Sequence, residues 1–115
     1  MATSKRYCLA CDLKDDPDLI AEYKAYHSPE GLWPEIADRI KASGITDMEI
    51  YLTGNRMFMI MEVDETFSFE RKAAMDAQDA KTREWEQLMW KFQQALPWAP
   101  PGEKWIQMEH IYKLP

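Results

Sequence analysis

The feature that most limits the fold is a run of twenty residues at positions 45–64, which reads ITDMEIYLTGNRMFMIMEVD. Apolar residues recur at every second position along both halves of this run, as they do in strands that bury one face of a sheet. The halves are joined by Thr53, Gly54 and Asn55, a sequence suited to a tight turn. The run therefore predicts a β-hairpin in the middle of the chain.

The two faces of this hairpin differ less in polarity than exposure of one face to water would require. One face carries residues that fit beneath helices: Met48, Ile50, Leu52, Met57, Met59, Met61 and Val63. The other face carries Glu49, Tyr51, Phe58, Ile60 and Glu62. A sheet face open to water is normally more polar than this second set. We therefore expect a second copy of the chain to cover it, as a face-to-face homodimer with two-fold symmetry. The alternative is a partly apolar surface.

The rest of the chain supplies helical regions and two further strands. Strands are predicted at 6–13 and 104–115, and helices within 14–27, 32–44, 67–75 and 80–96. The order strand, helix, hairpin, helix, strand is typical of a ferredoxin-like α+β sandwich, in which an antiparallel sheet carries helices on one face. We expect residues 1–115 to form a single domain, and two copies to form a dimeric α/β barrel.

Charge and hydropathy argue against several classes of partner. The chain has 14 basic and 20 acidic side chains, a net charge of −6, whereas nucleic acids and anionic membranes are bound by clustered Lys and Arg. No apolar run approaches the ~20 residues of a membrane span. The first residues, MATSKRYCLAC, lack the apolar core of a signal peptide. We expect a cytoplasmic protein that binds neither nucleic acid nor membrane.

The pair Cys8 and Cys11 raises the question of a redox or zinc site. Side chains three apart in a strand point to opposite faces, and a zinc site would need two further ligands. We therefore expect two reduced cysteines in a strand. The chain also lacks a phosphate-binding glycine loop, a nucleophile motif and metal-ligand spacing, since His27 and His110 are far apart. No metal or cofactor is expected, which leaves general acid–base chemistry by His, Tyr and carboxylates.

Tyr23 and His27 lie four residues apart and so share one face of a predicted helix. The helix is then broken at 28–31, and Trp33 comes at the start of the next one. We interpret the break as a turn that brings Trp33 or its neighbours to the mouth of a small polar pocket above Tyr23 and His27. Two plainer interpretations stay open: His27 as a structural, hydrogen-bonded histidine, and Trp33 and Trp85 as core residues.

Several motifs resemble those of the L-rhamnose mutarotase family: EYKAYHSPEGLWPEI, MEIYL, MFMIMEV, REWEQLM and the terminal LP. They occur in the family's order over residues 6–115, with small insertions at 29–32 and before the last strand. The Tyr-x-x-x-His pair followed closely by Trp-Pro-Glu is fairly specific. The resemblance implies a ferredoxin-like fold that dimerises through its sheets. It also implies an isomerase that interconverts the α and β anomers of a 6-deoxyhexose without a cofactor.

The resemblance further implies roles for individual residues. His27 matches the family's proton donor, Tyr23 a substrate-binding tyrosine, and Trp85 the first of two adjacent pocket tryptophans. Glu86 stands in place of the second tryptophan, and Met48 in place of a substrate-binding tyrosine. Both replacements change the part of the pocket where sugar hydroxyls would be distinguished. The predicted monosaccharide substrate is therefore L-rhamnose or L-fucose.

Two competing functions use the same fold. A cofactor-free monooxygenase or haem-degrading enzyme would use the same space between helices and sheet, because fold alone does not decide function. A non-catalytic sugar-binding module would fill the pocket with Trp33, Met48 and Trp85 and would shut His27 off from solvent.

His110 is a further candidate for the pocket. It shares the alternation of Ile106 and Met108, which are predicted to face the helices. On that pattern, His110 would enter the pocket from the wall opposite His27.

Overall fold

The computed structural model describes residues 5–115. Its strands are β1 (Lys5–Leu13), β2 (Ile45–Thr53), β3 (Arg56–Val63), β4 (Gln93–Gln94) and β5 (Ile106–Gln107). Its helices are α1 (Pro17–Tyr26), α2 (Pro34–Ala42), α3 (Phe69–Gln78) and α4 (Ala80–Met89). The helices therefore follow the first strand and the hairpin, in the predicted order.

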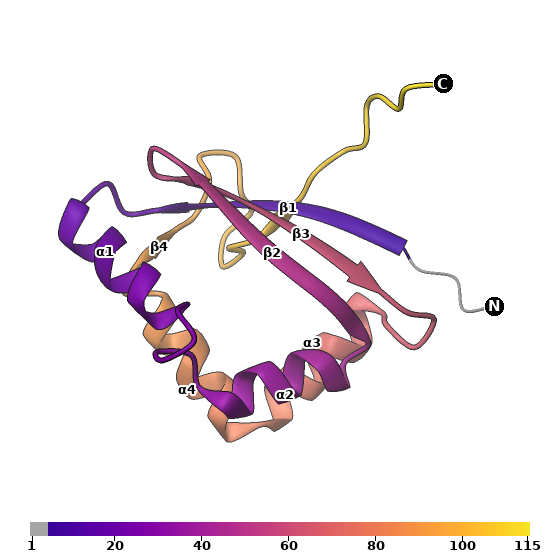
Figure 1. Cartoon of the computed structure of the whole chain (residues 1–115), viewed down its shortest axis with the longest axis horizontal. Coiled ribbons are helices and arrows are strands. Elements are labelled where there is room, and N and C mark those ends of the chain that lie inside the picture. Colours follow the sequence, from indigo (N-terminus) through magenta and orange to yellow (C-terminus); the bar gives the residue numbers. More distant parts are fainter. Residues whose placement is uncertain (1–4) are drawn as a thin grey trace.

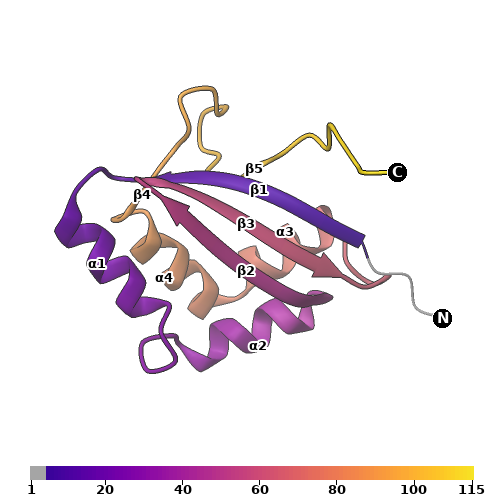
Figure 2. The same ribbon diagram turned by 45° about the horizontal axis from the view of Figure 1, so that its top comes forward.

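The strands form one antiparallel sheet in the order β2-β3-β1-β4, and β5 pairs with β1 on the same edge as β4. The helices lie together on one face of this sheet, and the opposite face carries no helix of the described residues (Figure 1, Figure 2). This is the ferredoxin-like α+β arrangement, and the fold prediction is confirmed.

The hairpin forms at the predicted turn. Thr53 pairs with Arg56, so Gly54 and Asn55 alone connect the strands. Gly54 has a φ of 56°, in the left-handed region that glycine adopts most easily. The β3 residues expected beneath the helices are buried: Met57, Met59, Met61 and Val63. Tyr51, on the opposite face, is 54% exposed. The two-residue alternation therefore orients the two faces as predicted, although Met48 and Ile50 are only half-buried and Leu52, next to the turn, is exposed.

The hairpin is irregular at its open end, away from the turn. Ile45 pairs with Val63 and Asp47 with Glu62, so Thr46 is an extra residue in β2. The Thr46 hydroxyl donates to the Glu62 carbonyl at 3.2 Å. A β-bulge of this kind bends its strand and increases the local twist. The sheet is therefore distorted at Thr46, on an edge strand.

β1 separates the two cysteines as predicted. Cys11 is 0% exposed and lies between Leu9 and Leu13 on the buried face, whereas Cys8 is half-buried on the other face. Burial raises the pKa of the Cys11 thiol to about 12. A thiol is a weak nucleophile until it loses its proton, so Cys11 is unreactive at neutral pH.

The C-terminal part of the chain departs from the sequence prediction in two places. The helix expected over 80–96 ends at Met89, and Gln93–Gln94 instead form β4 against β1. The cause is tertiary, because the Lys14 N–H donates to the Phe92 carbonyl at 2.8 Å and brings this segment to the sheet. The edge of β1 thus captures residues whose spacing alone predicts a helix.

The second departure is the final strand, expected over 104–115. Within the described residues, only Ile106–Gln107 of this segment pair with β1, opposite Ala10 and Leu9. The Met108 N–H still donates to β1 at 2.7 Å, and the chain then leaves the sheet (Figure 1). His110 is exposed, with its Nε2 3.0 Å from the Tyr112 carbonyl oxygen. The prediction that His110 enters the pocket is therefore wrong.

The break between α1 and α2 is a compact turn. His27 caps the C-terminus of α1, and Ser28 Oγ donates to the Ala25 carbonyl at 2.7 Å. Gly31 packs onto the same carbonyl so closely that a Cβ at this position would lie 1.9 Å from the Ala25 oxygen. Trp33 follows as the N-cap residue of α2. The turn therefore depends on the missing side chain of Gly31.

Gly31→Ala should destabilise the protein, because the added methyl group would overlap the Ala25 carbonyl and force the turn apart. Overpacking of this kind costs about 1–3 kcal/mol, and we expect the urea unfolding midpoint to fall accordingly. Glu30→Ala, at an exposed position of the same turn, is the control and should change the midpoint little. Equal midpoints for Gly31→Ala and the wild type would show that the turn tolerates a side chain.

Candidate active site

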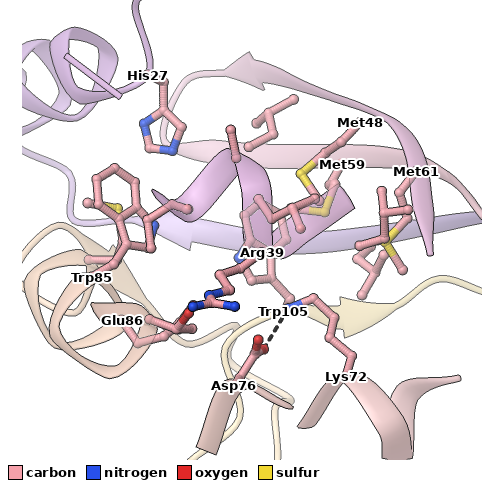
Figure 3. A pocket seen from close by; sticks show the side chains of 18 of the residues that line it. His27, Arg39, Met48, Met59, Met61, Lys72, Asp76, Trp85, Glu86 and Trp105 are labelled. Carbon is pink, nitrogen blue, oxygen red and sulfur yellow. Dashed lines mark hydrogen bonds and ion pairs between the residues drawn. The ribbon is translucent and has the colours of Figure 1, made fainter. Parts of the chain in front are cut away.

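A cavity of about 1180 Å³ lies between the sheet and the helices, lined by residues of the three long strands and of α1, α2, α3 and α4. Pockets for small molecules commonly measure roughly 300–1,000 Å³, so a small ligand would occupy only part of this one. Figure 3 shows His27 and Trp85 at one end of the cavity and Lys72 and Asp76 at the other. The two ends differ in chemistry, one aromatic and the other charged.

Five of the six residues predicted for the pocket line this cavity: Tyr23, His27, Met48, Trp85 and Glu86. The sixth, Trp33, stands behind Trp85, with its ring 5.1 Å from the Trp85 ring. Lys81 Nζ lies 4.7 Å from the centre of the Trp33 ring. Leu32, the neighbour of Trp33, does line the cavity. The break after α1 therefore contributes Leu32 directly and supports Trp85 through Trp33.

Two aromatic rings hold the imidazole of His27. Tyr23 stacks on it with 4.2 Å between ring centres, and Trp85 meets it edge-on at 5.7 Å. His27 Nδ1 lies 2.8 Å from the Tyr23 carbonyl oxygen. A carbonyl oxygen can only accept, so Nδ1 carries a proton, and in the neutral ring Nε2 keeps its lone pair. Nε2 is therefore the nitrogen that can take a proton from a ligand.

Burial shifts the pKa values of both His27 and Tyr23, in opposite directions. Burial lowers the pKa of His27 below its ordinary 6.5, and the hydrogen bond to the Tyr23 carbonyl partly opposes this. His27 nevertheless stays accessible to solvent, so at pH 7 a mainly neutral imidazole is open to a ligand. Burial raises the pKa of the Tyr23 hydroxyl. Tyr23 therefore stays protonated and can donate a hydrogen bond.

Glu86 adds a carboxylate to the cavity wall. Its Oε2 forms an ion pair with Lys104 Nζ at 2.5 Å, and the same ammonium group lies 5.0 Å from the centre of the Trp90 ring. The Lys104 side chain is 10% exposed, whereas that of Glu86 is 48% exposed. The more deeply buried lysine therefore positions the carboxylate without removing it from solvent.

The charged residues at the far end of the cavity were not predicted from the sequence. Lys72 pairs with Asp76 at 2.6 Å, drawn as a dashed line in Figure 3, and Arg39 pairs with Asp79 at 3.3 Å. Lys72 and Asp76 are four residues apart on α3, a spacing that predicts an ordinary surface pair on a helix. The sequence carries no signal that distinguishes them from other such pairs.

Gln93 was missed as well, although a signal for it exists. Its side chain lines the cavity, is 3% exposed, and donates from Nε2 to the Tyr23 hydroxyl at 3.2 Å. Gln93 follows Trp85 and Met89 at intervals of four, so a polar residue continues an otherwise apolar stripe. A buried glutamine at such a position needs hydrogen-bond partners.

Among residues 5–115, no group of three or more His, Cys, Asp or Glu side chains is placed to hold a metal ion. No helix in this range is long and apolar enough to cross a membrane. His27, Tyr23 and Glu86 are the groups next to Trp85 that can exchange protons or hydrogen bonds with a ligand.

Comparison with known proteins identifies the family. The family model described as L-rhamnose mutarotase matches residues 6–114, nearly the whole chain. The chain belongs to the L-rhamnose mutarotase family. Mutarotases are isomerases that interconvert the anomers of a sugar, so the predicted family and enzyme class are confirmed.

The relatives of this chain are named for two different sugars, L-fucose and L-rhamnose. The chain is 44% identical over 110 residues to the L-fucose mutarotase of Xanthomonas campestris pv. campestris, covering 96% of this chain and 88% of that protein. It is 38% identical over 76 residues to the L-rhamnose mutarotase of Yersinia pestis, covering 64% and 67%. The crystal structure of the Formosa agariphila L-rhamnose mutarotase has the same fold, with a TM-score of 0.68, 20% identity and coverage of 96% and 99%.

The environment of His27 predicts its titration. In wild-type protein the His27 imidazole should titrate below pH 6.5, as followed by NMR of the ring carbon-bound protons. Trp85→Leu should raise this pKa toward 6.5, because water then replaces part of the aromatic wall that disfavours the charged ring. Trp90→Leu, on an exposed residue of the same region, should leave the His27 pKa unchanged.

The same shift has a consequence for stability. Because the folded pKa lies below the unfolded value, the stabilisation from neutral His27 is complete above pH 6.5 and is lost as pH falls. An His27 pKa at or above 6.5 in the wild type would contradict this account of the site.

Proposed function

We propose that this chain is a mutarotase that interconverts the α and β anomers of a 6-deoxyhexose, L-fucose or L-rhamnose, by acid–base ring opening. The observation that carries the proposal is the state of His27: Nδ1–H is bound to the Tyr23 carbonyl, and Nε2 keeps a lone pair in an open cavity. Family membership and the relatives named for these two sugars support the same reaction.

His27 can carry the proton through the reaction. Nε2 removes the proton from the anomeric hydroxyl O1, the C1–O1 bond becomes a carbonyl, and the bond between C1 and the ring oxygen O5 breaks. The imidazolium then returns the proton to O5, and the open-chain aldehyde forms. Both oxygens are bonded to C1, so one nitrogen placed beside that carbon can serve both. Rotation about C1–C2 followed by the reverse steps gives the other anomer.

The cavity wall offers contacts for both sides of a sugar. Trp85, Met48 and Met59 present apolar surface, which suits C–H groups and the methyl group of a 6-deoxyhexose. Tyr23 and Glu86 present a hydroxyl and a carboxylate, which suit the ring hydroxyls. Met48 and Glu86 occupy the two positions that depart from the rhamnose pattern. We assign the choice between L-fucose and L-rhamnose to these two residues.

The two competing functions are not favoured. A non-catalytic module requires His27 to be shut off from solvent, and His27 is exposed at a cavity. The monooxygenase or haem-degrading alternative rested on the fold alone, and the family match points to an isomerase instead.

The homodimer is part of the proposal and rests on the helix-free face of the sheet. Strand pairing places Tyr51 beside Phe58, and Phe58 beside Ala10, in one row across that face. Ile60 and Cys8 lie in the next row, which ends in Glu49 at the β2 edge. This contiguous apolar patch suits a second copy related by two-fold symmetry. We place the resulting enzyme in the cytoplasm, where L-fucose and L-rhamnose would reach it as free sugars.

His27→Asn should abolish most of the anomerase activity while the fold survives. Asparagine cannot exchange a proton at neutral pH, and general acid–base catalysis is worth about 10²–10⁴-fold. The rates are measured by saturation-transfer proton NMR on L-fucose, L-rhamnose, D-galactose and D-glucose, with and without protein. His110→Asn changes the exposed histidine and should leave the rates unchanged. Exchange by His27→Asn at the wild-type rate would remove His27 from the mechanism.

Ile60→Glu should convert the dimer into a monomer or prevent folding. Burial of Tyr51, Phe58 and Ile60 on both copies should contribute several kcal/mol, at roughly 25 cal/mol per Å², and a buried carboxylate would oppose it. Sedimentation velocity at micromolar concentration measures the association state. Gln87→Glu adds the same charge to an exposed position of α4 and should leave the dimer intact. A wild-type monomer under these conditions would contradict the proposed dimer.

A further inference from the structure

Gln93 has a polar atom that nothing in the described structure accounts for. Its side chain is 3% exposed and lines the cavity, and its backbone is held in the sheet opposite Leu13. Within residues 5–115, Oε1 is buried without a hydrogen-bond partner, the one side-chain atom for which this is found. Buried polar side chains are nearly always satisfied, so an exception at a cavity wall points to a ligand.

The second atom of the amide is already used. Gln93 Nε2 donates to the Tyr23 hydroxyl at 3.2 Å, which leaves the Tyr23 O–H proton to be donated elsewhere. Burial keeps Tyr23 protonated by raising its pKa. The pair therefore presents one donor, the Tyr23 O–H, and one acceptor, Gln93 Oε1, side by side.

We propose that Tyr23 and Gln93 together bind a single hydroxyl group of the sugar, and that Gln93 is a specificity-determining residue of this site. An alcohol hydroxyl accepts one hydrogen bond and donates another, so it is the complement of this pair: it accepts from Tyr23 O–H and donates to Gln93 Oε1. The inference rests on the proposed sugar substrate and deepens it.

Either orientation of the Gln93 amide leaves one donor and one acceptor for a sugar hydroxyl. With the amide rotated by half a turn, Tyr23 donates to Oε1, and Nε2 becomes the unpartnered atom. The sugar hydroxyl then accepts from Nε2 and donates to the Tyr23 oxygen. In both orientations one hydroxyl completes the network, whereas a hydrogen, a fluorine or a methoxy group cannot.

The pair is also placed to bring the sugar to the reactive nitrogen. The Tyr23 ring stacks on His27, so its hydroxyl and the imidazole are held on one rigid unit of α1. A hydroxyl bound by Tyr23 and Gln93 would therefore set the position of the ring relative to His27. This explains why Gln93 is polar although its strand partner Leu13 and its chain neighbour Phe92 belong to the hydrophobic core.

The test measures binding of sugars that lack one hydroxyl. L-fucose, L-rhamnose and their derivatives deoxygenated at C2, C3 or C4 are titrated by NMR into wild type, Gln93→Leu and Gln94→Leu. For one position, removal of the hydroxyl should weaken binding to the wild type by about tenfold or more, because the buried pair then loses its partner. In Gln93→Leu, removal of the same hydroxyl should weaken binding by less than about threefold. Gln94→Leu, at the exposed neighbour, should behave as the wild type does.

Failure of this inference is distinguishable from failure of the proposed function. Suppose that the wild type binds and isomerises the sugars, but removal of each hydroxyl weakens binding equally in the wild type and in Gln93→Leu. Gln93 then does not bind a sugar hydroxyl. If the wild type neither binds nor isomerises any of the sugars, both proposals are overturned. A purely structural glutamine would lower the melting temperature when replaced and leave the penalties unchanged. We expect the melting temperature of Gln93→Leu to hold or rise, and Gln93→Met repeats the measurement should the leucine variant not fold.

Discussion

The pairing of β1 on both of its edges joins the hairpin to the C-terminal part of the chain. Along most of its length β1 pairs with β3, and its other edge is divided between β4 and β5. This pairing directs Leu9, Cys11 and Leu13 toward the helices, because side chains alternate across a strand. It also sets the cavity floor, since β4 brings Gln93 opposite Leu13 and β5 brings Gln107 opposite Leu9. A change in β1 would therefore reach both the core and the site.

Much of this arrangement follows from local patterns in the sequence. The hairpin at 45–64 alternates with a period of two, so its turn and its buried face could be predicted without tertiary information. Tyr23 and His27 are four apart on a helix, which brings their side chains together in any fold that keeps the helix. Their stacked rings in the structure are the direct result. The hairpin and the Tyr23–His27 pair could therefore be predicted from local periodicity alone.

The remaining features depend on contacts with distant parts of the chain, which no local pattern records. The segment 90–96 has helical spacing, but β1 offers it backbone partners and it becomes a strand. The final segment pairs with β1 only at Ile106–Gln107 and then leaves the sheet, so His110 ends in solvent rather than in the pocket. Gln93 interrupts an apolar stripe, but its hydrogen bond to Tyr23, 70 residues away in the chain, cannot be read from that local pattern. Trp33 was expected at the mouth of the pocket and instead packs behind Trp85. Residue spacing in the sequence does not distinguish these two positions.

The bulge at Thr46 bears on how the protein avoids aggregation. Among the strands of residues 5–115, β2 has a neighbour on one side only, and a regular edge strand is a template on which further chains can add. The extra residue breaks the even spacing of donors and acceptors there, and Asp47 and Glu49 add charge beside it. The bulge therefore makes this end of β2 a poorer template for a further strand, while residues 47–53 keep a regular register with β3. A local irregularity in one strand thus works against sideways growth into a filament.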